Sequence, residues 1–326
     1  MNTEPSLSVV VCAYTLDRWE DLQAAITSVQ SQHRPPDDVV LVVDHCPELQ
    51  RLAGRMLHGV LVLPNQQHKG LSGARNTGVE AAVGDVVAFL DDDATAHPSW
   101  TDRLLSDYRD PRVVGVGGLV VPWWETDRPA WFPPEFDWVV GCSYRGLPEQ
   151  PAPVRNFIGA NMSFRKDALH AAGGFRTDLG RVGTRPLGCE ETELCLRITS
   201  RRPDAVLLYD PSAAVRHRVP AARATWSYFR SRCYAEGLSK ALVARYSNRS
   251  AALSSERAYL KSTIPRAFRE ALHPGRPAPA RTALALALGV CATALGYAVG
   301  SVRARRLAVP APAEPAYRAP VKGSPV

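Results

Sequence analysis

The sequence predicts an α/β fold built on a Rossmann-like, mostly parallel sheet flanked by helices, with a hydrophobic helix near the C-terminus. Three observations support this. Short β-branched apolar runs alternate with helical patterns through the first 121 residues. The runs are apolar throughout, as in strands that are buried on both faces. Several of them end in polar or acidic residues, at the sheet edge where open α/β sheets bind their ligands.

The pattern of elements is clearest in the N-terminal half. We expect strands at residues 7–14, 39–43, 60–63, 86–90 and 113–121, and helices at 18–32, at 72–83 and from Pro98 onward. No GxGxxG follows the first strand, so the dinucleotide-binding fingerprint is missing. What recurs is a polar or acidic residue at the strand ends: Tyr14, Asp44, Asp91 and Asp93.

Beyond residue 122 the regular alternation stops. The segment PWWETDRPAWFPPEFDW is rich in proline and tryptophan and predicts a loop or insertion. Its tryptophans either stack on acceptor sugars, lie at a lipid interface or cover the sheet. The elements expected after it are a strand at 157–164, a helix at 166–172, a glycine-rich loop at 178–189, a helix at 190–200, a strand at 205–209 and a long helical region at 221–245.

Composition narrows the function classes. The chain of 326 residues has a net charge of +7, which suits acidic small molecules or an anionic membrane surface. It has no Cys/His finger spacing, no RNP-like aromatic pattern and no dense basic block, so we expect no nucleic-acid partner. Seven scattered cysteines without CxxC indicate reduced thiols, and no basic region precedes the first apolar run. We therefore expect a cytoplasmic protein.

The stretch VVAFLDDDATAHPSW places three carboxylates at the end of a core strand. Asp91 and Asp93 are spaced i, i+2, which puts both carboxylates on one side of an extended segment. A divalent cation that bridges a diphosphate needs such a pair, since hard cations take carboxylate oxygens. The structural alternative is an acidic helix start before Pro98.

Two further motifs offer acid–base and metal chemistry. Glu190 and Glu191 follow the glycine-rich loop, so one of them would act as a general base delivered by a mobile loop. Their structural alternative is stabilisation by the helix dipole at the first turn. His217, in VRHRVP, would be a neutral imidazole ligand for the same metal, or a structural histidine.

Other polar residues suit a nucleotide diphosphate. Asp44 would contact the base or ribose, although turn chemistry before a proline explains it equally well. Arg75 would reach a base or phosphate, or remain solvated. Arginines on one probable helix suit a diphosphate leaving group: Arg223, Arg230 and Arg232.

Taken together, these features resemble the family 2 glycosyltransferases, which have the GT-A fold. The resemblance covers residues 7–240 and rests on five signatures in order: SVVVCAY, LVVDH, GLSGARNTGV, FLDDD and GANMSFRKDAL…GGF…CEETELCLR. It implies inverting transfer from a nucleotide-diphosphate sugar, with Mn²⁺ or Mg²⁺ on the diphosphate.

The resemblance also assigns roles to residues. It places Asp44 and Arg75 at the nucleoside, and Asp91 and Asp93 in the DxD motif, with Asp93 the expected metal ligand. His217 matches the family's late metal-binding histidine. Two departures stand out. A single Asp44 followed by histidine replaces the usual Asp-Asp, and Glu191 replaces the second acid of the Glu-Asp pair, which lengthens the expected base by one methylene.

The C-terminal region adds a hydrophobic segment. Residues 282–302 carry no charge, and at about 1.5 Å per residue they would cross a hydrocarbon core of about 30 Å. Arginines flank both ends, so the positive-inside rule chooses no orientation, and a soluble packing helix is the alternative. We expect a GT-A domain at 1–245 (nucleotide-binding half 1–121, acceptor half 122–245), a helical linker at 246–280, a membrane-associated segment at 281–303 and a disordered tail at 304–326.

These observations predict a metal-dependent inverting glycosyltransferase at the inner face of the cell membrane. Its donor would be a nucleotide-diphosphate sugar and its acceptor an envelope glycan or lipid-linked intermediate. One alternative is a non-catalytic scaffold that binds nucleotide sugars, which the acidic residues Asp91, Asp93 and Glu191 argue against. The other is a sugar-1-phosphate nucleotidyltransferase, which would want a glycine-rich basic loop where this chain has CAYTLDRW.

Overall fold

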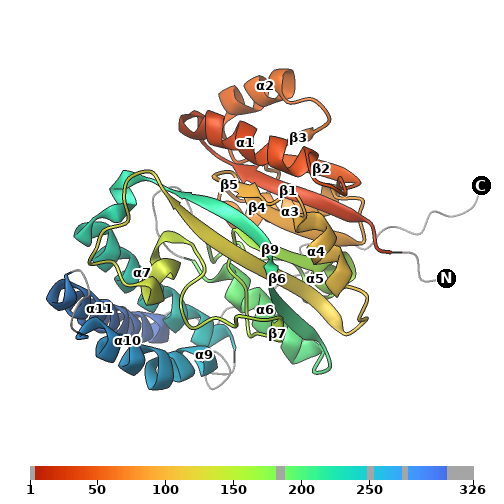
Figure 1. Ribbon diagram of the computed structural model, residues 1–326. Helices are drawn as coiled ribbons and strands as arrows, with labels where there is room; N and C mark the ends of the chain where they lie inside the picture. Colours follow the sequence, from red (N-terminus) through yellow and green to blue (C-terminus); the bar gives the residue numbers. More distant parts are fainter. Residues whose placement is uncertain (1–3, 181–187, 248–252, 274–277, 307–326) are drawn as a thin grey trace, which may run out of the picture.

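The computed structural model describes residues 4–180, 188–247, 253–273 and 278–306. Within these ranges the chain forms one central sheet with helices on both faces (Figure 1). Most of the glycine-rich loop and of the expected disordered tail lies outside the described residues.

The first four strands form the parallel part of the sheet. They are β1 (Leu7–Ala13), β2 (Asp38–Val43), β3 (Leu61–Pro64) and β4 (Val86–Asp91), in the spatial order β3-β2-β1-β4. The helices between them are α1 (Trp19–Gln30), α2 (Pro47–Met56) and α3 (Leu71–Ala81). The α/β prediction is confirmed. Helix α2 was not expected from the sequence; Pro47 occupies its first turn, where a missing N–H is harmless.

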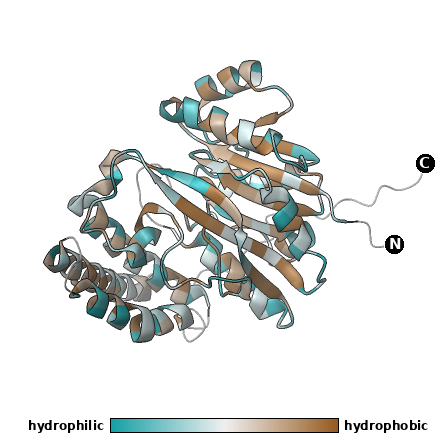
Figure 2. Ribbon diagram, viewed as in Figure 1, coloured by the Kyte–Doolittle hydropathy of each residue, from teal (hydrophilic) through white to brown (hydrophobic). Residues whose placement is uncertain are grey.

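Strand β1 shows why this part of the chain is apolar on both sides. Leu7, Val9 and Val11 pack in one core cluster, and Val10 packs in the cluster on the opposite face. Helix α1 buries Leu22, Ala25, Ile26 and Val29, an i, i+3, i+4, i+7 stripe, in the first cluster. Hydrophobic colouring accordingly runs along the central strands (Figure 2).

The second part of the sheet is mixed rather than parallel. Strand β8 (Asn161–Arg165) lies between β4 and β6 (Val113–Trp124) and runs antiparallel to both. Strand β9 (Val206–Val219) is parallel to β6, and the short strands β5 (Ala94–Ala96) and β7 (Ala152–Pro153) run antiparallel to β9. The expected parallel arrangement therefore ends at β4. Strand β9 also extends ten residues beyond the predicted end at 209, which brings residues 210–219 into the sheet.

The remaining helices surround this second part. They are α4 (Trp100–Asp107), α5 (Lys166–Ala172), α6 (Glu190–Arg201), α7 (Trp226–Tyr246), α9 (Ser254–Ala258), α10 (Ile264–Ala271) and α11 (Pro279–Arg306). The expected aromatic loop contains a 3₁₀ segment, η2 (Pro134–Val140), and a π-helical turn η4 (Tyr259–Thr263) joins α9 to α10. The C-terminal hydrophobic helix is present as α11, which lies beside α7 and α10 at the edge of the molecule (Figure 1).

Candidate active site

Strand β4 delivers the acidic cluster to the sheet edge. Asp91 is its last residue, and β5 begins at Ala94, so Asp93 lies in a tight turn rather than in the extended segment that we expected. Ala94 pairs with His217 across β5 and β9. This register places His217 Nε2 3.1 Å from Asp93 Oδ1 and 4.0 Å from Asp91 Oδ2.

Asp91, Asp93 and His217 offer three ligand atoms that all lie within 4.8 Å of one another. Two carboxylates and one imidazole are a donor set that a divalent cation such as Mn²⁺ accepts. Asp93 and His217 are buried, whereas 32% of the Asp91 side chain is exposed. The three residues therefore fit a divalent cation that a ligand would reach from the exposed side of Asp91.

The charges in this cluster are strongly coupled. Burial opposes the charged form of Asp93, but His217 and the nearby arginines outweigh it and lower the pKa of Asp93. Burial likewise opposes the charged imidazole, yet the Asp93 carboxylate raises the pKa of His217 to about 10. Without a metal the pair is an ion pair, so a metal would have to displace a proton from His217 in order to bind there.

Arg18 supplies a counter-charge that sequence reasoning missed. Its Nη1 atom lies 2.7 Å from Asp92 Oδ1 and 3.1 Å from Asp93 Oδ2. The Tyr14 ring lies against the Arg18 guanidinium, 5.4 Å from its centroid, and is itself 47% exposed. Tyr14, one of the polar residues that the sequence placed at the ligand-binding edge of the sheet, thus contacts Arg18. The sequence did contain a signal for such a cation. Asp92 is a third carboxylate at the end of a buried strand, and a buried carboxylate requires a cation nearby.

Arg75 is buried at the wall of the site rather than solvated. Its Nη1 atom is 2.8 Å from Glu190 Oε1, and its Nη2 atom is 3.6 Å from Asp91 Oδ1 and donates to the carbonyl of Gly159. The Phe89 and Phe175 rings flank the guanidinium. Arg75 therefore connects the acidic cluster of β4 to the first turn of α6, which the sequence had not indicated.

Glu190 and Glu191 have different environments, although they are neighbours. Glu190 is 4% exposed, pairs with Arg75 and has one oxygen, Oε2, without a hydrogen-bond partner. Burial raises the pKa of Glu191 to about 8, and the charge of Glu190 adds to the shift. One carboxylate is thus held by a cation, and the other has a pKa close to neutrality, where a general base is most effective.

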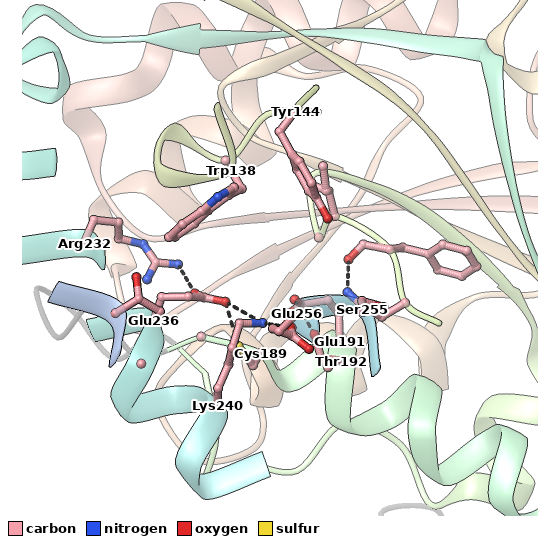
Figure 3. A pocket seen from close by; sticks show the side chains of 18 of the residues that line it. Trp138, Tyr144, Cys189, Glu191, Thr192, Arg232, Glu236, Lys240, Ser255 and Glu256 are labelled. Atoms are coloured by element: carbon pink, nitrogen blue, oxygen red, sulfur yellow. Dashed lines mark hydrogen bonds and ion pairs between the residues drawn. The ribbon is translucent and has the colours of Figure 1, made fainter. Parts of the chain in front are cut away.

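One cavity of about 480 Å³ joins these groups. Asp91, Glu191 and His217 line one part of it, and much of the rest is lined by η2, residues 155–160 and the helices α7, α9 and α11. A chain of ion pairs crosses the second part: Arg232 with Glu236, Glu236 with Lys240, and Lys240 with Glu256, which also pairs with Arg155 (Figure 3).

The other predicted residues are distributed unevenly. Arg223 lines the cavity, with its Nη2 atom 3.7 Å from Asp93 Oδ2. Arg230 is exposed and does not line the cavity. Arg232, two residues further along α7, does line it. Asp44 is buried and accepts hydrogen bonds from Asn65 Nδ2 and the Gly70 backbone, so its carboxylate orders the loop before α3.

The tryptophan-rich segment mainly packs against the hydrophobic core. Trp131 stacks on Trp226 of α7 with the ring centroids 3.9 Å apart, and Trp124 packs edge-on against Phe132. Trp138 lines the cavity and is visible at its wall in Figure 3, whereas Trp123 is 59% exposed. Trp138 therefore lies where its ring is able to stack on a molecule in the cavity.

Comparisons with known proteins agree with this geometry. The family model described as Glycosyl transferase family 2 matches residues 8–173. Glucosyl-dolichyl phosphate glucuronosyltransferase of Haloferax volcanii is 37% identical over 241 residues, which cover 73% of this chain and 77% of that protein. Pre-mycofactocin glycosyltransferase of Mycobacterium tuberculosis is 31% identical over 48% of this chain and 32% of its own.

A solved structure extends the likeness to the fold. The mannosyltransferase PcManGT of Pyrobaculum calidifontis, in complex with GDP-Man and Mn²⁺, superposes with a TM-score of 0.58 at 19% identity. The superposition covers 93% of this chain and 87% of that one.

Proposed function

The chain belongs to glycosyl transferase family 2 and has the GT-A fold, and on this basis we propose that it transfers a sugar from a nucleotide-diphosphate donor to a lipid-linked acceptor, with inversion and with Mn²⁺. The observation that carries the proposal is that Asp91, Glu191 and His217 line one cavity. Chemistry at the donor diphosphate and proton removal from an acceptor can therefore occur in the same enclosed space.

Asp91, Asp93 and His217 would hold the metal, which supplies positive charge at the diphosphate leaving group when it is bound. The imidazole favours Mn²⁺ over Mg²⁺, since Mg²⁺ prefers an all-oxygen set. The Mn²⁺ in the structurally similar mannosyltransferase complex supports this choice. Arg223, which lines the cavity near Asp93, is placed to add charge-assisted hydrogen bonds to a phosphate.

Glu191 is the proposed general base. An inverting transfer is a single displacement, so the acceptor hydroxyl must lose its proton as the nucleotide leaves. Asp91 and Asp93 are engaged in the metal site, and Glu190 is held by Arg75. Glu191 lines the cavity with a pKa of about 8, high enough to accept a proton readily and low enough to be partly ionised near neutrality. Arg75 and Glu190 would fix the start of α6 and so position Glu191.

The acceptor side of the cavity suits an amphiphilic, anionic molecule. Basic residues outnumber acidic ones there: the wall holds two carboxylates, Glu236 and Glu256, and four cations, Arg155, Arg232, Lys240 and Arg257. Apolar side chains of α11 line the same wall. The 37% identical relative is named for a glucosyl-dolichyl phosphate substrate, an acceptor that joins a sugar, a phosphate and a lipid. We place this activity at the inner face of the cell membrane, where lipid-linked intermediates and cytoplasmic nucleotide sugars meet. The donor sugar and base are open to a screen.

A two-stage assay tests the function. A thermal-shift screen of nucleotide sugars with and without Mn²⁺ should reveal one donor whose binding raises the apparent melting temperature only when the metal is present. That donor is then incubated with glycosylated lipid phosphates, and NMR of the product should show the inverted anomeric configuration. A donor that binds but is never turned over, with or without acceptor, would instead support the nucleotide-sugar-binding scaffold.

A further inference from the structure

Helix α11 has its more hydrophobic side facing outward. Side chains at 284, 288, 291, 295, 298 and 302 recur every three or four residues and form a stripe of exposed or half-exposed apolar groups: Leu284, Leu288, Cys291, Leu295, Ala298 and Val302. Leu284, Leu295 and Val302 are 52%, 59% and 55% exposed. Only 28% of the apolar window of this helix is buried, whereas the core helix of a soluble protein would be mostly buried.

The inner side of α11 is rich in small residues, with Leu286 also buried, and packs on the rest of the protein. A Cβ atom on Gly237 of α7 would collide with the backbone carbonyl of Thr293, and one on Gly296 would collide with the carbonyl of Tyr234. A Cβ atom on Gly300 would lie 2.8 Å from that of Ala241, and one on Gly289 would collide with the Phe136 ring. The two helices approach closely through small residues, as helices in membranes commonly do. A spanning α11 would have to abandon these contacts.

Both ends of α11 carry positive charge. Arg281 lies at its start and Arg303 near its end, and both are exposed. Between residues 253 and 306 the sequence carries nine basic residues against two acidic ones, Glu256 and Glu270; the basic ones are Arg257, Lys261, Arg266, Arg269, Arg276, Arg281, Arg303, Arg305 and Arg306. Cations at both ends are poorly suited to a helix that crosses a bilayer, because one end would face the translocated side. They suit a helix whose two ends lie at the same anionic surface.

The same helix also forms part of the cavity wall. Four of its residues line the cavity: Val290, Thr293, Ala294 and Tyr297. Part of the cavity wall therefore lies on the same helix as the apolar stripe.

We propose that α11 lies flat in the surface of an anionic phospholipid membrane, with its leucine stripe in the acyl boundary and its small-residue side on α7. Helix α7 takes the place of the polar face that an isolated interfacial helix would present to water. The acceptor, in a step that rests on the proposed function, enters the cavity sideways along α11 while its lipid stays in the bilayer. A second copy of the chain on the stripe is the competing occupant.

Vesicle co-sedimentation of the full chain tests the surface. Equimolar phosphatidylcholine and phosphatidylglycerol vesicles should bind the protein, and pure phosphatidylcholine should bind it more weakly. Leu284→Glu with Leu295→Glu should weaken partitioning by roughly 100-fold or more, since each leucine loses its apolar transfer into lipid. The matched control, Met56→Glu with Val83→Glu, adds the same charge at positions that are 54% and 73% exposed and should bind as the wild type does.

Depth measurements separate a flat helix from a spanning one. Cys291, an exposed thiol at the middle of the stripe, accepts a fluorescent label once Cys12 and Cys46 are alanine. Labels are placed on single cysteines at 284, 291 and 302 in turn. Quenching by brominated lipids should then report the same shallow depth for all three labels. A deep 291 with 284 and 302 at opposite surfaces would show a span and overturn the proposal.

The remaining outcomes are also decisive. A vesicle-free dimer that the paired glutamates dissociate, without vesicle binding, would assign the stripe to a second copy. Neither vesicle experiment contains donor or acceptor, so it can fail while transfer succeeds, or succeed while transfer fails. Circular dichroism and thermal unfolding of the paired-glutamate variant provide the check on folding.

Discussion

The two parts of the sheet hold their charged groups in different ways. In the parallel part, Asp91 and Asp93 stand at the end of a buried strand, with Arg18 and Arg75 from the same part of the chain beside them. In the mixed part, the charged residues of the cavity come mainly from helices, as in the pairing of Lys240 with Glu236 and Glu256. The first arrangement is a compact cluster that suits a small charged group. The second forms a larger part of the cavity wall.

This difference predicts a division of labour. Changes in the parallel part should abolish donor binding and every reaction that depends on it. Changes in the mixed part should reduce transfer and leave donor binding largely intact. His217 and Arg223 are the exceptions, because they follow the parallel part in the chain and yet lie beside Asp93.

The largest effect is expected at Asp93. Asp93→Ala should lower Mn²⁺-dependent turnover by roughly 10⁴-fold, because the metal contributes several kcal/mol of charge stabilisation in the transition state. Calorimetry should show that nucleotide binding no longer depends on Mn²⁺. Asp204→Ala, an exposed aspartate far along the chain, is the control and should be unaffected. Unchanged donor affinity in Asp93→Ala with Mn²⁺ would remove the metal from this site.

Glu191 tests the acceptor side of the comparison. Glu191→Gln keeps size and hydrogen bonding but removes basicity, so transfer should fall by roughly 10²- to 10⁴-fold with donor affinity little changed. Single-turnover transfer and donor calorimetry measure the two quantities separately. Glu190→Gln is the informative partner, because it breaks the buried pair with Arg75 and should also lower thermal stability. A fully active Glu191→Gln beside an inactive, stably folded Glu190→Gln would assign the base to Glu190.

The pH dependence sharpens the assignment. The base must be ionised, and the pKa of Glu191 is raised to about 8. The value of kcat/KM should therefore rise about tenfold per pH unit below that pKa, roughly 10²-fold from pH 6 to pH 8, and level off above it. In Glu191→Gln this rise should disappear. A wild-type profile that is already flat from pH 5 upward would mean that the base has an ordinary carboxyl pKa.

The smallest effect is expected at His217, where the two parts meet. His217→Ala removes one of three ligands and should weaken Mn²⁺ binding roughly 10-fold, with activity recovered at high Mn²⁺ concentration. A Mn²⁺ titration of donor turnover measures this shift. If saturating Mn²⁺ restores nothing, His217 has a further role beyond holding the metal, and the separation between the two parts is less clean than the geometry suggests.

The parallel part was largely predictable from local sequence. Continuous apolar runs such as β1 and the polar residues that end them are properties of neighbouring residues, and the edge where they meet follows from parallel pairing. The contacts of Arg18 and Arg75 were not predictable, because each depends on a partner more than 70 residues away. An arginine in the sequence does not reveal whether it will be buried.

The mixed part depends on pairing over longer distances. Strand β8 lies between β4 and β6, and no pattern in the neighbouring residues predicts this strand order. Strand β9 contains Pro211 and a register shift relative to β6, which obscured its length. His217 was chosen from the sequence as a ligand for the same metal as the aspartates, with support from a family motif rather than from strand prediction. The structure places it beside Asp93, and its role as a ligand stays a prediction.

The close contact of Gly237 with α11 has a practical consequence for protein production. Deleting a C-terminal hydrophobic helix is the usual way to obtain a detergent-free enzyme. Here deletion would uncover the glycine-lined side of α7 and remove Val290 and Tyr297 from the cavity wall. Polar substitutions confined to the outward leucines would keep both, so a water-soluble form for crystallisation is better made by changing the surface of α11 than by shortening the chain.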